Sequence, residues 1–258
     1  MSSVLLDIKE GIGFIVLNRP DRLNAFTREM AFLLQNRLDE CASLHEVRAV
    51  CITGAGRAFS AGQDLSEITG PDALGMDKIL SEHYNPIVTR IRNLPKPVVA
   101  AVNGVAAGAG ANIALCCDIV LASKSASFIQ AFSKIGLIPD SGGTWFLPRL
   151  VGWQKAAGIA MLGDKIGAVE AERMGMVYKV YEDDEFAGAA RALTAVLAQM
   201  PTRALAFIKH ALNYSATNTL EAQLLLEDDL QQKAALTKDY AEGVRAFLDK
   251  RAPVFKGE

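Results

Sequence analysis

Short apolar runs that contain β-branched residues alternate with longer amphipathic stretches from the N-terminus to Glu182. Such runs predict strands, here at residues 4–9, 13–17, 47–53, 97–102 and 119–122, and the first two predict a hairpin across Glu10, Gly11 and Ile12. The amphipathic stretches predict helices at residues 27–43, 79–94 and 110–117. Alternation of strands and helices is typical of an α/β layered fold.

The pattern changes after Glu182. Residues 184–199, 203–215, 219–236 and 239–249 all have helical periodicity, and no strand pattern is left. We therefore expect a core of residues 1–200 followed by a helical region of residues 201–258.

The composition adds exclusions rather than a function. The chain has 258 residues, a net charge of −2 and a pI near 6.0, so it lacks the basic excess of a nucleic-acid-binding protein. The N-terminus has no basic and apolar signal-peptide pattern, and no uncharged apolar run reaches the ~18 residues of a membrane span. The four cysteines have no metal-ligand spacing. We expect a reduced, cytoplasmic protein with no membrane, nucleic-acid or metal partner.

Asp140 is the first candidate for chemistry. Residues 83–163 hold only two acids, Asp118 and Asp140, and the second lies in the glycine-rich segment 136–144 (GLIPDSGGT). A lone carboxylate among small and apolar residues is poorly solvated, which raises its pKa towards neutral pH. Asp140 is therefore a candidate general base.

Two loops of small residues, 54–65 and 104–112, each follow a predicted strand. Ala61 and Gly62 in the first loop, and the start of the helix in the second, are able to point backbone N–H groups at a carbonyl oxygen. The first loop alone is better explained as a tight turn, and the presence of two such loops makes the functional interpretation as good as the structural one. Two such loops and one base together suit enolate chemistry.

Other motif classes fit less well. The glycines at 54–56 and 108–110 begin a dinucleotide-binding fingerprint, but Phe59 and Ile113 stand where its third glycine belongs. The chain also lacks a phosphate loop, a His-Glu-x-x-His motif and a Gly-x-Ser-x-Gly elbow. Trp145 and Phe146 are expected in the core, and the basic residues Lys250, Arg251 and Lys256 are surface residues or phosphate contacts.

The order and spacing of several stretches resemble the enoyl-CoA hydratase/isomerase (crotonase) superfamily over essentially the whole chain. The stretches are 17–25 (LNRPDRLNA), 59–65 (FSAGQDL), 96–104 (KPVVAAVNG), 117–119 (CDI) and 242–251 (EGVRAFLDKR). The resemblance implies a superhelix of ββα units, a C-terminal helical region that drives trimerisation, and acyl-CoA thioester substrates. It implies a homotrimer or a dimer of trimers, and no cofactor, since CoA is part of the substrate.

The same resemblance assigns the site residues. It places Ala61 and Ala109 as the oxyanion-hole amides and Asp140 as the catalytic acid/base. It places the substrate and its CoA moiety against Asn24, Ala25, Gly62, Gln63, Asp64, Leu65, Asn112, Phe132, Pro139 and Gly143.

Departures from the hydratase pattern narrow the expected reaction. Hydratases of the family use two glutamates, and those positions here are Asn112 and Phe132. Asp140 stands where hydratases have glycine, a placement similar to dienoyl-CoA isomerases and the chlorobenzoyl-CoA dehalogenases. The stretches 131–145, 108–112 and 84–86 are similar to isomerases of phenylacetate degradation, which convert a ring-1,2-epoxide of phenylacetyl-CoA to an oxepin and shift a 3-enoyl double bond to position 2.

We therefore expect an isomerase that forms an enolate, with Phe132 as a wall of the acyl pocket and Asn112 as a structural or substrate-orienting hydrogen-bond group. Three alternatives remain from the sequence. They are a Δ3,Δ2-enoyl-CoA isomerase of fatty-acid oxidation, a dehalogenase with Asp140 as nucleophile and His83 activating water, and a non-catalytic RNA-binding relative.

Overall fold

The computed structural model describes residues 2–69 and 73–258, so Met1 of the predicted N-terminal pattern lies outside the described residues. The chain opens with the predicted hairpin, in which β1 (Val4–Lys9) pairs antiparallel with β2 (Ile12–Leu17). Glu10 and Gly11 form the connection, and both have a positive φ (56° and 77°). Glycine adopts this conformation at no steric cost, which suits a two-residue hairpin turn.

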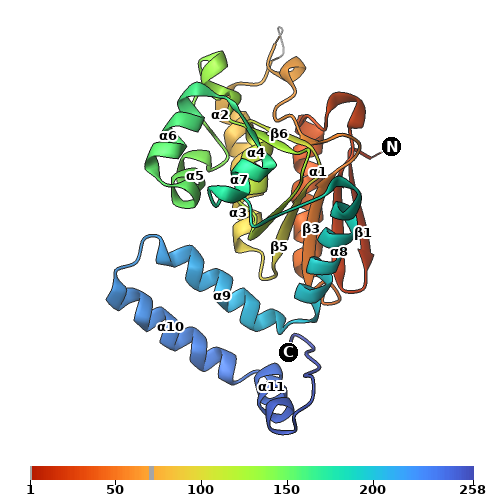
Figure 1. Ribbon diagram of the computed structural model, residues 1–258, viewed down its shortest axis with the longest axis vertical. Helices are drawn as coiled ribbons and strands as arrows, with labels where there is room; N and C mark the ends of the chain where they lie inside the picture. The colour runs from red at the N-terminus through yellow and green to blue at the C-terminus, as the bar shows by residue number, and fades with distance from the viewer. Residues whose placement is uncertain (1, 70–72) are drawn as a thin grey trace.

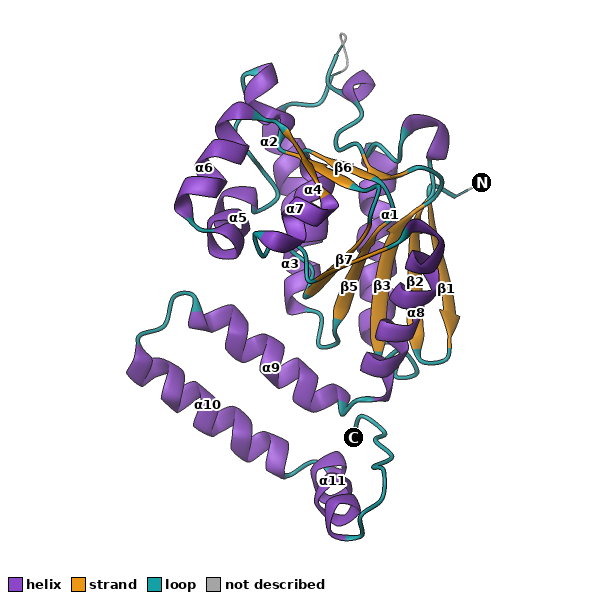
Figure 2. Ribbon diagram, in the orientation of Figure 1, coloured by secondary structure: helices purple, strands orange, loops and turns teal. Residues whose placement is uncertain are grey.

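The main sheet has the strand order β1-β2-β3-β5-β7-β10 and is parallel from β2 onward. Its remaining strands are β3 (Ala49–Gly54), β5 (Val98–Val102), β7 (Ile119–Ser123) and β10 (Lys179–Tyr181). Both faces are buried, as expected for parallel strands with helices on each side. Val50 and Ile52 face α1 (Arg28–Ser43), whereas Ala49 and Cys51 face α8 (Asp183–Gln199). Figure 2 shows these two helices on opposite sides of the sheet.

A second, smaller sheet has the order β4-β6-β8-β9. Its strands are β4 (Ala58–Ser60), β6 (Val105–Ala107), β8 (Ser127–Ile129) and β9 (Lys165–Gly167). The strands β4, β6 and β8 each follow one strand of the main sheet after a short connection. The core therefore consists of repeated ββα units, which confirms the predicted α/β superhelix. The sequence patterns did not indicate these three-residue strands.

The helices between the strands differ from the predicted ones mainly at residues 76–93. The single predicted helix is a short α2 (Met76–Lys78), a π-helical turn (Ile79–Tyr84) and α3 (Asn85–Asn93). The helix α4 (Ala109–Leu115) follows the second glycine loop, as predicted. The helices α5 (Gly143–Val151), α6 (Trp153–Leu162) and α7 (Ala168–Arg173) complete the core.

The C-terminal region contains α9 (Thr202–Ser215), α10 (Leu220–Ala235) and α11 (Lys238–Leu248). Figure 1 shows α9 and α10 side by side at one end of the molecule, away from the sheet. A buried ion pair fixes α9 to the core, because Lys209 Nζ lies 2.8 Å from Asp118 Oδ2 and donates to the carbonyls of Ile91 and Lys96. The boundary between residues 200 and 201 stays a prediction.

The four cysteines are free thiols buried in the core, which confirms that they are packing residues. Within the described ranges, no helix is both long and apolar enough to span a bilayer.

Candidate active site

Asp140 lies in the connection between a 3-10 helix (Ala131–Ile135) and α5, and its side chain is partly buried. Its backbone carbonyl accepts hydrogen bonds from the amide of Gly143 (2.7 Å) and from Nδ2 of Asn112 (2.9 Å). Ser141, held at a φ of 51°, donates its hydroxyl to Asp140 Oδ1 (2.8 Å). The loop that carries the carboxylate is thus fixed at its backbone.

Burial raises the pKa of Asp140 from 3.8 to about 6, against the opposing hydrogen bonds from Ser141 and the backbone. Desolvation disfavours the charged form of a carboxyl group, and these two hydrogen bonds only partly compensate. The raised pKa agrees with the expectation from the sequence. A base with this pKa is ionised at neutral pH and still accepts a proton readily.

Asn112 is fully buried on α4 and is a structural residue of the site. Its Nδ2 supports the Asp140 carbonyl, and its Oδ1 accepts a hydrogen bond from Gln130 Nε2 (2.7 Å). A Cβ on Gly143 would lie 2.4 Å from Asn112 Nδ2, so only glycine allows this approach. The Asn112 amide thus positions the Asp140 loop, and its predicted contact with substrate stays a prediction.

Ala61 was predicted to supply an oxyanion-hole amide, and the structure corrects this. Its N–H donates to the carbonyl of Leu23 (2.9 Å), and the next amide, that of Gly62, donates to Ser60 Oγ (3.1 Å). Both groups are already paired inside the protein. Neither is available to a ligand without breaking a buried hydrogen bond.

Gln63 provides the free amide that the sequence did not single out. Within residues 2–69 and 73–258, no acceptor pairs with the backbone N–H of Gln63 or of Ala109. The two loops approach each other closely at Gly62, which has a φ of 90°. A Cβ on this residue would lie 3.4 Å from the Ala109 nitrogen. The glycines before both donors, Gly62 and Gly108 (φ 52°), therefore turn the two amides towards neighbouring positions.

Phe132 is buried beside this pair of loops. Its Cζ lies 3.7 Å from the position that a Cβ on Gly108 would occupy. The ring, in the first turn of the 3-10 helix, thus lies next to Gly108, and its predicted contact with substrate stays a prediction.

Other predicted binding residues have clear structural contacts. The buried Asn24 side chain donates to the carbonyls of Ala55 (2.9 Å) and Ala58 (2.8 Å), so it braces the first loop from inside. Asp64 accepts from Ser66 and pairs with Arg19 (2.9 Å), and these hydrogen bonds outweigh burial and lower its pKa.

Three further predicted positions differ in accessibility. Leu65 is exposed, Ala25 is buried and Pro139 is partly exposed. Gly143 is buried, with its amide committed to Asp140. Among these four positions, Leu65 is the one whose side chain is exposed to solvent.

The π-helical turn brings two aromatic rings close to the site. His83 is buried, with Nε2 3.3 Å from Arg28 Nη1 and its ring edge-on to Phe32, so it faces α1. Burial and the Arg28 charge lower the pKa of His83. Tyr84 donates its hydroxyl to Gln63 Oε1 (2.7 Å), on the residue that carries one free amide.

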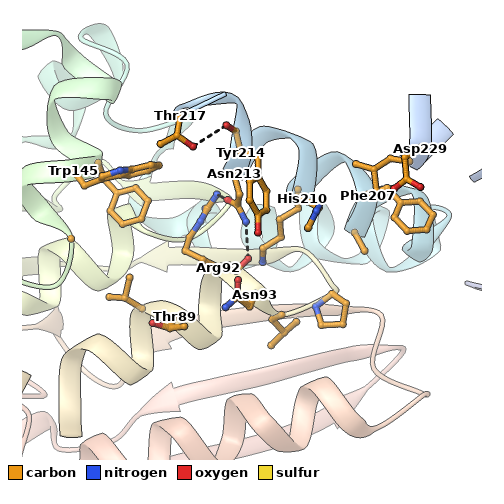
Figure 3. A pocket seen from close by; sticks show the side chains of 18 of the residues that line it. Thr89, Arg92, Asn93, Trp145, Phe207, His210, Asn213, Tyr214, Thr217 and Asp229 are labelled. Atoms are coloured by element: carbon orange, nitrogen blue, oxygen red, sulfur yellow. Dashed lines mark hydrogen bonds between the residues drawn. The ribbon is translucent and has the colours of Figure 1, made fainter. Parts of the chain in front are cut away.

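A cavity of about 760 Å³ lies between α3, α5, α9 and α10. Figure 3 shows Arg92, Trp145, His210, Asn213 and Tyr214 gathered around it. Trp145 was expected in the core, but its side chain is 37% exposed and lines this hollow. Asp140, Gln63 and Ala109 are not among the lining residues. The carboxylate and the two free amides, rather than this hollow, identify the candidate active site.

Comparison with known proteins agrees with this geometry. The model of the family described as enoyl-CoA hydratase/isomerase matches residues 7–258. A relative from Escherichia coli (strain K12), 1,2-epoxyphenylacetyl-CoA isomerase, is 48% identical, with 100% of both chains covered. A relative from Rhodobacter capsulatus, named "Probable enoyl-CoA hydratase", is 46% identical over 99% of this chain and 98% of the other. The solved structure of an enoyl-CoA hydratase from Bacillus anthracis has a TM-score of 0.92 and 32% identity, covering 99% of this chain and 100% of that one.

Proposed function

The chain belongs to the enoyl-CoA hydratase/isomerase family, and from this premise we propose that it is an isomerase that converts ring-1,2-epoxyphenylacetyl-CoA to oxepin-CoA. The observation that carries the proposal is a single carboxylate, Asp140, with a pKa of about 6, whose loop is hydrogen-bonded to the helix that begins at the unpaired amide of Ala109. A relative 48% identical over the whole chain bears the name of this activity.

The proposed mechanism begins at the thioester carbonyl, which accepts hydrogen bonds from the amides of Gln63 and Ala109. These donors stabilise the negative charge that forms on the oxygen and thereby acidify the C2 proton. Asp140 removes this proton to give the enolate. The protonated carboxyl group then returns a proton further along the conjugated system, so the reaction is a net isomerisation.

A site with one acid favours isomerisation over hydration. The hydratase positions for two glutamates hold Asn112 and Phe132, and Asn112 is committed to Asp140 and Gln130. Hydration needs one group to activate water and another to handle the α-carbon proton, whereas a proton shift needs one base that reaches both carbons. We propose the shift of 3-enoyl-CoA to trans-2-enoyl-CoA as a second reaction of the same site.

The dehalogenase alternative loses support because His83 is engaged with Arg28 and α1. For the proposed chemistry, CoA enters as part of the substrate, and no metal or redox cofactor is required. Exposed apolar side chains on the C-terminal helices, among them Leu212, Leu225 and Phe247, support a homotrimer or a dimer of trimers that buries them.

The test compares the wild type with Asp140→Asn on ring-1,2-epoxyphenylacetyl-CoA, with oxepin-CoA followed by chromatography. We expect conversion by the wild type and a loss of about 100- to 10,000-fold in the variant, the range for a general base. Asp164→Asn is the matched control, since this exposed carboxylate lies outside the site. A wild type that only shifts the double bond of 3-enoyl-CoA would reassign the protein to fatty-acyl isomerisation.

A further inference from the structure

Tyr84 is a fully buried tyrosine whose hydroxyl points at the candidate active site. It ends the π-helical turn, and its ring packs edge-on against Phe26 (centroids 6.0 Å apart, planes at 75°) and against His83 (6.4 Å, 79°). These contacts hold the ring on two sides. Only the hydroxyl end is left to make polar contacts.

The hydroxyl lies between the two halves of the site. It donates to Gln63 Oε1, on the same residue whose backbone amide is free. Burial raises the pKa of the Tyr84 phenol well above 10, and the nearby charges of Asp140 and Glu67 raise it further. Tyr84 therefore stays protonated at every working pH and remains a hydrogen-bond donor.

The present acceptor is easily replaced. The Gln63 side-chain oxygen is neutral, and a hydrogen bond between neutral groups contributes only about 1 kcal/mol net. A substrate oxygen that reaches the same position is an equivalent partner. The phenol is thus a fixed donor with an exchangeable acceptor.

We propose that Tyr84 is a specificity-determining residue, whose hydroxyl leaves Gln63 Oε1 when substrate binds and donates to the ring oxygen of the epoxide. The inference rests on the proposed function. The epoxide oxygen is bonded to the ring carbon that is attached to C2. It is therefore three bonds from the thioester carbonyl carbon. The Tyr84 hydroxyl lies 2.7 Å from Oε1 of Gln63, the residue whose backbone amide is proposed to hold the substrate carbonyl. The epoxide oxygen and the Tyr84 hydroxyl are therefore both close to this one residue.

Tyr84 forms and breaks no covalent bond in this role. The oxygen is retained in the oxepin, so the same donor serves substrate and product, and the phenol keeps its proton throughout. A 3-enoyl-CoA with a hydrocarbon acyl chain has no oxygen at that position. The residue should therefore distinguish the two substrate classes while Asp140 serves both.

The experiment measures kcat/KM of the wild type and Tyr84→Phe on ring-1,2-epoxyphenylacetyl-CoA and on cis-3-hexenoyl-CoA. We expect a loss of about 10-fold on the epoxide, the order of one neutral hydrogen bond, and a change of less than about 2-fold on the hexenoyl thioester. The readout is the ratio of the two values. Tyr178→Phe, at an exposed tyrosine, is the matched control.

Gln63→Met separates this role from a structural one. The substitution removes the oxygen that Tyr84 meets in the free protein and keeps the backbone amide. If Tyr84 acted only by holding the Gln63 side chain, both variants would lower the two rates by a common factor. Equal losses on both substrates in Tyr84→Phe, or no loss on either, would overturn the inference while leaving the proposed function intact.

A second measurement uses only the wild type, so it tests the inference even if Tyr84→Phe does not fold. The wild type is inhibited with 1,2-epoxycyclohexylacetyl-CoA and with cyclohexylacetyl-CoA, which differ by the ring oxygen. We expect the epoxide to bind about 10-fold more tightly, and equal inhibition constants would contradict the role of Tyr84. A wild type that does not convert the aryl epoxide would overturn the proposed function and this inference together.

Discussion

At the scale of the residue, the ionisation of Asp140 sets the pH dependence. Its pKa is raised to about 6 by burial, and the phenol of Tyr84, the other titratable group near it, stays neutral. We expect kcat/KM for cis-3-hexenoyl-CoA to rise with pH through about 6 and to level off above it, because only the carboxylate removes the C2 proton. Initial rates between pH 5 and 8 check this.

Stability gives an independent check on the same residue. The pKa of an unfolded aspartate is ~3.9, so folding favours the protonated form of Asp140. The contribution of Asp140 to the free energy of unfolding is then fully present below about pH 3.9 and is lost as the pH rises through about 6. Denaturation of Asp140→Asn should lack this decline. A midpoint of the rate profile near pH 4, or identical stability profiles, would contradict a buried and desolvated base.

The oxyanion donors show that a sequence pattern locates a loop but does not show which of its backbone N–H groups are free. The glycine-rich loops predicted amides at the right segments, and Ala109 stays a candidate. We propose Gln63 rather than Ala61 as the donor from the first loop, because the Ala61 amide already donates to the carbonyl of Leu23, which is distant in the sequence. Which N–H groups are already paired depends on a tertiary contact that local spacing does not encode.

At the scale of the element, the close approach of α4 to β4 depends on Gly110. A Cβ at this position would lie 2.6 Å from the Ser60 carbonyl oxygen and 2.7 Å from Ser60 Oγ. Gly110→Ala should therefore push the start of α4, with the Ala109 amide, away from the first loop. We expect a loss of about 1–3 kcal/mol in the free energy of unfolding and a larger relative loss of kcat than of substrate affinity.

Gly188→Ala is the control for this prediction. Gly188 lies within α8 and has no atom within 4 Å of an added Cβ. Alanine there should leave stability unchanged or increase it by up to about 1 kcal/mol. Urea titrations give the free energies of unfolding of both variants. Similar changes from the two substitutions would argue against a tight α4–β4 contact.

The elements themselves were predictable to different degrees. The hairpin, the long strands and the four C-terminal helices have clear patterns over five or more residues, and these patterns identify them. Strands such as β4 and β6 have three residues and lie inside glycine-rich loops. They form because repeated units stack upon one another, and so short a segment has no period of its own. The π-helical turn before α3 is likewise a product of packing around Tyr84.

At the scale of the whole molecule, a buried ion pair joins the C-terminal helices to the catalytic core. Lys209 on α9 contacts Asp118, whose carboxylate also pairs with Arg92 (3.2 Å) and accepts from the amide of Val98 (2.8 Å). Burial lowers the pKa of Lys209, and the Asp118 charge opposes this. Removing Lys209 takes away the shorter of the two ion pairs of Asp118 and leaves Arg92 as its partner.

Lys209→Met should lower the free energy of unfolding by about 3 kcal/mol. Hydrogen exchange should also accelerate in α9 before it does in β5. The double variant Lys209→Met/Asp118→Asn should be no more stable than the single one, since removal of the Asp118 carboxylate also leaves Arg92 without its ion pair. A single variant as stable as the wild type would show that α9 is held by its apolar contacts alone.

The hydrogen bond from Asn112 to the Asp140 carbonyl has a further consequence. Asn112 and Ala109 are three positions apart on α4, so the loop that bears the proposed base is hydrogen-bonded to the same helical turn that carries the proposed oxyanion donor. One turn of α4 therefore separates the Ala109 amide from the residue that holds the Asp140 backbone. The Asp140 backbone is thus tied to α4, and Gly143 in the same loop has no room for a side chain.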